Sequence, residues 1–119
     1  YADHETADAP SPDQIMTCGS SIGCKAFLID TFDKTGGTLL DHVGTNTLQK
    51  LANRADELGM LFAIAGSLTE QSIRQVLSVH PNYVAVRGAV CAADRSSTVQ
   101  RWLVEKLAGA VATKTRAND

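Results

Sequence analysis

An aspartate and a lysine stand four residues apart at the end of an apolar run. Residues 26–29 are apolar, Asp30 follows directly, and Lys34 comes four positions later. This pattern is typical of a buried parallel strand that opens into an active-site mouth. A lysine held beside a carboxylate there can attack a carbonyl to form a Schiff base, or transfer protons next to one. The alternative is a solvated surface pair, which contributes well under about 1 kcal/mol.

Two further apolar runs end in glycine-containing loops that could bind phosphate. The first ends in Gly66-Ser67, and the second in Arg87-Gly88-Ala89. Glycine allows backbone N–H groups to approach an anion, and a helix that follows each loop adds a favourable N-terminal field. Arg87 can form paired hydrogen bonds to phosphate oxygens. Either glycine alone could serve only a tight turn, but the two loops on successive strands favour phosphate binding.

Three other residue types could take part in chemistry, and each has a simpler interpretation. His42, next to Asp41, could move protons, but we expect it to cap or pack at a helix end. Trp102 lies on the apolar face of the last predicted helix, where we expect it in the core. Cys91 has no identified partner base, and we interpret it as a packing residue.

Composition excludes several classes of protein. The chain has 119 residues, 44% of them hydrophobic, and a net charge of −2. These values indicate one small globular domain and give no electrostatic reason to expect nucleic acid or an anionic membrane as a partner. No apolar run is long enough to span a bilayer.

The cysteines and histidines do not indicate a disulfide framework or a metal site. The spacing of Cys18, Cys24 and Cys91 matches no zinc motif, so we expect buried, unreactive thiols in a reducing cytosol. The three histidines are scattered along the chain, and no pair has a metal-ligand spacing.

The apolar pattern predicts alternating helices and strands. Ser11-Pro12 begins a helix to residue 22, residues 45–58 repeat apolar positions at helical spacing, and Ser67 to Glu70 has the spacing of a capping box. We predict the following elements: helices 11–22, 45–58, one after residue 67 that ends near His80, and 96–112; strands 25–29, 60–65 and 83–86; and a frayed tail from residue 114.

This order requires parallel strands whose carboxyl ends share one edge. The run 60–65 is continuously apolar, which is typical of a strand buried on both faces. The arrangement is either a small open sheet or a sector of a (β/α)₈ barrel. Chain length favours the open sheet, whereas the start at Tyr1-Ala2-Asp3, which reads as the end of another element, favours the barrel sector.

Three segments together resemble one family of enzymes. Residues 28–42 (LIDTFDKTGGTLLDH) resemble the sixth-strand motif of the (5-formylfuran-3-yl)methyl phosphate synthases, which are the 4-(hydroxymethyl)-2-furancarboxaldehyde phosphate synthases of methanofuran biosynthesis. Residues 63–68 resemble the seventh strand of that family, residues 84–91 the eighth, and residues 1–3 the end of the fifth. The resemblance covers nearly the whole chain in order.

The resemblance implies a fold and a reaction. It implies that residues 1–119 form the C-terminal half of a TIM barrel, from the end of strand five through helix eight. It implies a class I aldolase-like lyase that condenses two molecules of glyceraldehyde 3-phosphate, with no metal or organic cofactor, in the cytoplasm. Its partner is a small phosphorylated substrate, and self-association or pairing with an N-terminal half is expected.

The resemblance also implies roles for individual residues. Asp30 and Lys34 match the family's late acid–lysine pair, and Gly66 to Ser67 and Arg87 to Ala89 fall where substrate phosphate is held. The family also uses lysines on strands two and four, for which this chain has no residues. We therefore expect the Schiff-base lysine outside this chain, and no activity from this half alone. Two other functions stay open: a non-catalytic half-barrel that binds phosphorylated ligands or self-associates, and a class I aldolase with another substrate.

Overall fold

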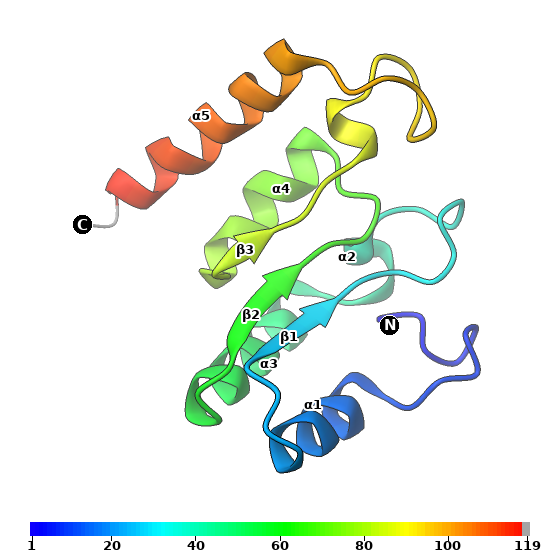
Figure 1. Ribbon diagram of the computed structural model, residues 1–119, viewed down its shortest axis with the longest axis vertical. Helices are drawn as coiled ribbons and strands as arrows, with labels where there is room; N and C mark the ends of the chain where they lie inside the picture. The colour runs from blue at the N-terminus through cyan, green and yellow to red at the C-terminus, as the bar shows by residue number, and fades with distance from the viewer. Residues whose placement is uncertain (118–119) are drawn as a thin grey trace.

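The structure is a computed structural model that describes residues 1–117, with side chains as far as residue 112. Helices and strands alternate along most of the chain (Figure 1). The α-helices are α1 (Pro12–Ser21), α2 (Leu39–His42), α3 (Thr45–Glu57), α4 (Glu70–Val76) and α5 (Arg101–Ala117). The strands are β1 (Ala26–Ile29), β2 (Leu61–Ile64) and β3 (Tyr83–Val84), and two short 3₁₀ turns are η1 (Leu77–Val79) and η2 (Gly88–Val90).

The three strands form one parallel sheet in the order β1-β2-β3. Ala26 pairs with Leu61 and Ile29 with Ile64, so the first two strands end in register. The connections run through α2 and α3 and then through α4, because parallel neighbours require a crossover. The α/β class and the parallel sheet are as predicted. The loops that follow the three strands lie at the same edge of the sheet (Figure 1).

The hydrophobic core lies on one face of the sheet, between the strands and α3 and α4. Alternate strand residues point into it, and Phe27 and Phe62 stack with ring centroids 6.1 Å apart. Burial of each large side chain contributes about 1.5–3 kcal/mol. Helices α3 and α4 contribute Leu48, Leu51, Ala52, Ala55, Ile73 and Val76 to this core, and α1, α2 and α5 add Met16, Leu39 and Leu107.

The opposite face of the sheet is exposed in the described part of the chain. Leu28, Leu61 and Tyr83, one from each strand, are 55%, 44% and 62% exposed. The prediction that residues 60–65 are buried on both faces is therefore wrong. Every second residue of β2 does reach the core, but the elements described here cover only one face.

Two helix boundaries differ from the prediction because local hydrogen bonds decide them. Thr69, not Ser67, caps α4, and its side chain and that of Ser72 bond reciprocally to each other's backbone N–H. The last helix begins at Arg101 rather than at residue 96, because Cys91 and Val99 form a β-bridge that closes a loop before it. The tail predicted to fray is helical to Ala117, and residues 118–119 lie outside the described part.

Several side chains predicted to be buried are exposed. Trp102 lies on the exposed side of α5 instead of in the core. Cys18 and Cys24 are exposed, and only Cys91 is buried as predicted; all three are free thiols. Cys18 and Cys24 lie at the end of α1 and in the turn after it, where no further layer covers them within residues 1–117. Among the described residues, none of the helices combines the length and the apolar composition that a membrane span requires.

Candidate active site

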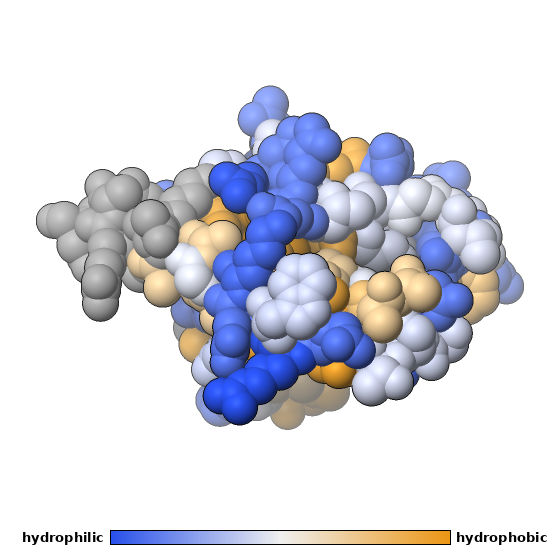
Figure 2. All heavy atoms as spheres, turned by 90° about the horizontal axis from the view of Figure 1, so that it is seen from above, coloured by the Kyte–Doolittle hydropathy of each residue, from blue (hydrophilic) through white to orange (hydrophobic). Residues whose placement is uncertain are grey.

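A cleft of about 660 Å³ lies at the carboxyl ends of the three strands. It is open to solvent and receives residues from the loop after each strand. Seen from above, hydrophilic residues run across the molecule with hydrophobic ones beside them (Figure 2). All the residues selected from the sequence line this cleft: Asp30, Lys34, Gly66, Ser67, Arg87, Gly88 and Ala89.

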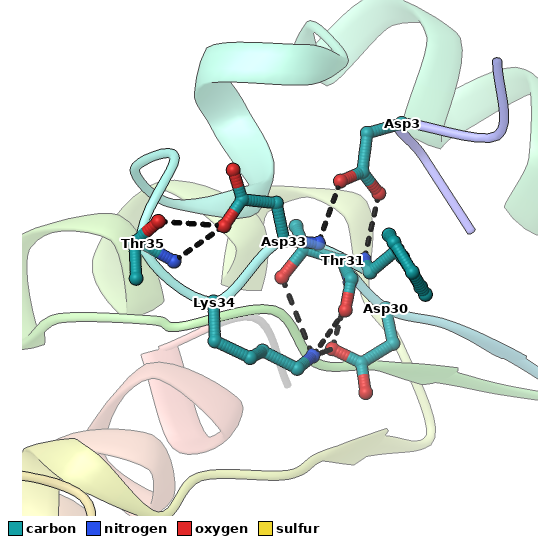
Figure 3. A network of polar contacts seen from close by, with 7 residues as sticks. Asp3, Asp30, Thr31, Asp33, Lys34 and Thr35 are labelled. Atoms are coloured by element: carbon teal, nitrogen blue, oxygen red, sulfur yellow. Dashed lines mark hydrogen bonds and ion pairs between the residues drawn. The ribbon is translucent and has the colours of Figure 1, made fainter. Parts of the chain in front are cut away.

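Lys34 is held by the strand-end residues that precede it. Its Nζ lies 2.7 Å from Oδ1 of Asp30, donates to the carbonyl oxygen of Thr31, and is 3.4 Å from the Thr31 hydroxyl (Figure 3). The side chains of Lys34 and Asp30 are 31% and 33% exposed. The ammonium is therefore fixed by three oxygens while one side of it reaches the cleft. In stability terms such a partly exposed pair contributes at most about 1 kcal/mol.

The loop between Asp30 and Lys34 is held by two further carboxylates. Asp33 accepts hydrogen bonds from the backbone N–H and the hydroxyl of Thr35, which lower the pKa of Asp33. Asp3 accepts from the backbone N–H groups of Phe32 and Asp33 at 2.7 and 2.9 Å. Burial raises the pKa of Asp3, but these hydrogen bonds lower it more, so the net shift is downward.

Asp3 was not predicted as a site residue. It precedes the loop by 29 and 30 positions, and no spacing rule connects residues that far apart. The segment 1–3 reaches the loop because the Ala2 N–H also donates to the carbonyl of Asp30 at 2.8 Å. Tyr1 and Phe32 complete the contact edge to face, with ring centroids 5.5 Å apart.

Gly66 is required by packing as well as by its place in the cleft. It has a φ of +115°, and an added Cβ would lie 3.0 Å from side-chain carbons of both Leu39 and Thr31. The carbonyl of Gly66 also accepts from the Leu39 N–H at 2.9 Å. Gly66 therefore brings the first two loops into contact. Ser67, next to it, is exposed and has a φ of +47°, an uncommon conformation for a residue with a side chain.

Arg87 lies in the loop after β3, three residues past the end of that strand, and contacts the same loop further along. Its Nε donates to the carbonyl oxygen of Arg95, and the side chain is exposed at the cleft. Gly88 and Ala89 form the short turn η2, and α5 starts only at Arg101. The last helix was predicted to begin at residue 96 and to add its N-terminal field to this loop, but ten residues of turn and bridge structure separate η2 from α5.

Three charged residues of the cleft were missed from the sequence. Asp94 and Arg95 come from the long loop before α5, whose position depends on the Cys91–Val99 bridge. Glu70 is the first residue of α4, and hydrogen bonds from Lys106 and then Arg74 lower its pKa. The cleft thus carries equal numbers of positive and negative side chains: Lys34, Arg87 and Arg95, with Asp30, Glu70 and Asp94.

His42 and Asp41 lie at the short helix α2. His42 is its last residue and is exposed, as expected for a residue at a helix end, and it does not line the cleft. Asp41 accepts from the Thr38 N–H at 2.7 Å and so closes the helix start. Among the described residues, no group of three or more His, Cys, Asp or Glu side chains is placed to hold a metal ion.

Ionisable side chains at the carboxyl edge of a parallel sheet define the class of α/β enzymes that bind ligands at strand ends. The family model described as 4-HFC-P synthase matches residues 1–108. The chain belongs to this family of synthases.

Curated relatives agree with the family match. The (5-formylfuran-3-yl)methyl phosphate synthase of Archaeoglobus fulgidus is 31% identical over 111 residues, which are 93% of this chain and 47% of that protein. The protein of the same name from Methanosarcina barkeri is 31% identical over 107 residues, 90% of this chain and 46% of its own length. The chain thus spans about half the length of the curated relatives it matches.

Proposed function

We propose that this chain is the C-terminal half of a synthase that condenses two molecules of glyceraldehyde 3-phosphate. The product is (5-formylfuran-3-yl)methyl phosphate, a precursor in methanofuran-type cofactor biosynthesis, and one phosphate and two molecules of water are lost. The observation that carries this proposal is the meeting of Lys34, Asp30 and Arg87 in one cleft at the strand ends. The family match and the names of the relatives support the furan phosphate product.

Each loop has its own role in this proposal. Arg87 binds a substrate phosphate, and the backbone N–H groups around Gly88, Ala89, Gly66 and Ser67 add hydrogen bonds to it. The substrate carbonyl then lies near Lys34, which transfers protons or supports an iminium formed on another lysine. Asp30 orients the ammonium of Lys34 through the 2.7 Å contact. No metal or organic cofactor enters this scheme.

The open face of the sheet supports the half-barrel part of the proposal. In a closed (β/α)₈ barrel that face lines the interior and is covered by the remaining strands. Leu28, Leu61 and Tyr83 would then pack against the other half, which the relatives have and this chain does not match. That half would also supply the lysine that bonds to substrate, so this chain alone is expected to be inactive. The complete synthase is expected to work in the cytoplasm.

The test is product formation in a preparation that contains both halves. Glyceraldehyde 3-phosphate is supplied, and the furan aldehyde phosphate is identified by its mass and its ultraviolet absorbance. A furan product from both halves, and none from this chain alone, supports the proposal. The same preparation is also given other aldehydes. If these condense and no furan product forms from glyceraldehyde 3-phosphate, the protein is instead a class I aldolase with a different substrate.

A second candidate function follows from the exposed apolar face alone. The chain would be a non-catalytic half-barrel that binds phosphorylated ligands or pairs with a second copy through Leu28, Leu61 and Tyr83. Sedimentation separates the two ideas. A stable dimer that Leu28→Glu dissociates, together with no activity when the other half is added, would favour this candidate.

A further inference from the structure

The N-terminal segment 1–3 contacts the loop that carries Lys34 through the carboxylate of Asp3, which has no role in the proposed reaction. Asp3 is buried, with 8% of the residue exposed, and its carboxylate points toward this loop (Figure 3). Both of its carboxylate oxygens are occupied, Oδ1 by the Phe32 N–H at 2.7 Å and Oδ2 by the Asp33 N–H at 2.9 Å (Figure 3). A buried carboxylate with each oxygen bonded to one of two successive backbone amides fixes the direction of both peptide planes.

One of those peptide planes also holds Lys34. The N–H of Phe32 and the carbonyl of Thr31 belong to the same peptide unit, and a trans peptide is planar with these two groups on opposite sides. Asp3 accepts the N–H on one side, and Lys34 Nζ donates to the carbonyl oxygen on the other. A rotation of this plane would therefore remove both contacts together.

The two hydrogen bonds also strengthen each other electrostatically. A carboxylate that accepts the N–H of a peptide polarises that peptide, which makes its carbonyl oxygen a better acceptor for an ammonium. Thr31 itself is fully buried, so its carbonyl has little freedom to turn toward other donors. The Ala2–Asp30 hydrogen bond at 2.8 Å keeps Asp3 in register with the end of β1.

We propose that Asp3 is a positioning residue for Lys34 and acts through the Thr31–Phe32 peptide. It does not touch substrate: Asp3 is not among the residues that line the cleft. Its effect on turnover rests on the proposed synthase function, whereas its effect on the Lys34 side chain does not. This difference allows the two ideas to be tested separately.

The first measurement is the rate at which an amine-reactive reagent labels Lys34, read by mass spectrometry and divided by the rate for Lys106. Lys106 pairs with Glu70 at 2.7 Å, far along the chain from Asp3, and reports any general loss of structure. In Asp3→Asn we expect this ratio to rise at least about threefold, since the loosened contacts of Lys34 are those of a partly exposed pair. The matched control is Asp56→Asn, at an exposed carboxylate of α3, which leaves the ratio unchanged.

The second measurement is steady-state turnover of glyceraldehyde 3-phosphate with both halves present. Asp3→Asn is expected to lower kcat about tenfold to a hundredfold, the size expected from a misplaced reacting group, with KM within about twofold. Asp3→Glu, which keeps a carboxylate, is expected to recover part of kcat. A purely structural role would lower the melting temperature and the active fraction, and would leave the Lys34 labelling ratio of the folded protein unchanged; that result overturns the proposal.

Hydrogen exchange of the wild-type protein tests the proposal even if the variants do not fold. The amides of Phe32 and Asp33 are expected to exchange as slowly as those of β1, because Asp3 covers both. If these two amides exchange at the rate of unprotected amides, Asp3 does not hold the loop and the proposal is overturned. If no preparation makes the furan product, the synthase proposal fails, and the labelling ratio still decides the role of Asp3.

Discussion

The loop after β1 and the loop after β3 both line the cleft, but different kinds of contact hold them. The β1 loop is fixed by residues distant in sequence: Asp3 bonds to Phe32 and Asp33, and Gly66 packs against Thr31. The β3 loop is fixed by near neighbours, mainly the hydrogen bonds of Asp94 to the N–H groups of Ser96 and Ser97.

This difference matches the tasks that we propose for the two loops. A group that moves protons must be held in one geometry, and contacts from other elements achieve this best. A loop that binds a phosphate tolerates small adjustments, and segments held by local, exposed hydrogen bonds open most readily. We therefore expect changes in the β1 loop to affect turnover and stability, and changes in the β3 loop to affect substrate affinity.

The largest effect is expected at Lys34. In a preparation that makes the furan product, Lys34→Ala should lower kcat about 100-fold to 10,000-fold, the range for loss of a proton-transfer group. Its melting temperature should stay close to that of the wild type, because the pair with Asp30 contributes little stability. Lys50→Ala, at an exposed lysine of α3, is the control. Normal turnover in Lys34→Ala removes Lys34 from the mechanism.

Gly66→Ala should give the next largest effect, on stability. The new Cβ would meet Thr31 and Leu39 at 3.0 Å in a backbone conformation that disfavours side chains. We expect a loss of about 2–4 kcal/mol of unfolding free energy, from backbone strain and crowding together. Gly109→Ala in α5 is the matched control, because its Cβ meets nothing within 4 Å and alanine favours a helix. Equal stability of the two variants in urea unfolding would contradict the packing role of Gly66.

The sheet, its parallel order and seven of the cleft residues could be predicted from the sequence, because these follow from local patterns. The apolar run before Asp30 and the glycines after the next two strands are visible within a few residues. What could not be predicted depends on contacts across the chain. Asp3 joins a loop 29 residues away, and Arg95 enters the cleft only because Arg87 and the Cys91–Val99 bridge fold the last loop back.

The errors in burial have a similar origin. An apolar run such as 60–65 predicts a strand but does not state how many layers cover it, and here one face is open. Trp102 shows the same limit, since helical spacing places it on an apolar stripe that nothing within the described residues covers.

Arg87 should affect binding more than turnover. Arg87→Lys keeps the positive charge but removes the paired donors and the contact of Nε with the Arg95 carbonyl. We expect KM for glyceraldehyde 3-phosphate to rise about tenfold, with kcat nearly unchanged, since a charge-assisted hydrogen bond is worth about 1.5–3 kcal/mol. Steady-state kinetics over a range of substrate concentrations separates the two constants. A fall in kcat with no change in KM would place Arg87 in the chemistry instead.

The smallest effects should appear in acid stability. Both Asp3 and Asp94 have pKa values lowered below 3.8 in the folded protein. Their stabilisation is therefore present above pH 3.8 and is lost as the pH falls through the lowered values. Urea unfolding should show that the unfolding free energy falls less between pH 7 and acid pH in Asp3→Asn than in the wild type. Asp94→Asn should alter this pH dependence less than Asp3→Asn does, because Asp94 is exposed and solvent screens its hydrogen bonds. A larger effect from Asp94→Asn than from Asp3→Asn would contradict the difference between the two loops.

The most direct test of the central claim is a titration of the ¹⁵N-labelled protein with glyceraldehyde 3-phosphate, followed by amide chemical shifts. We expect smaller shifts on residues 30–34 and the largest shifts on Gly66, Ser67, Gly88 and Ala89. We also expect Arg87→Lys to reduce these shifts. Shifts that cluster elsewhere, or that are equal for unphosphorylated glyceraldehyde, would contradict the claim that the strand-end cleft binds a phosphorylated substrate beside Lys34.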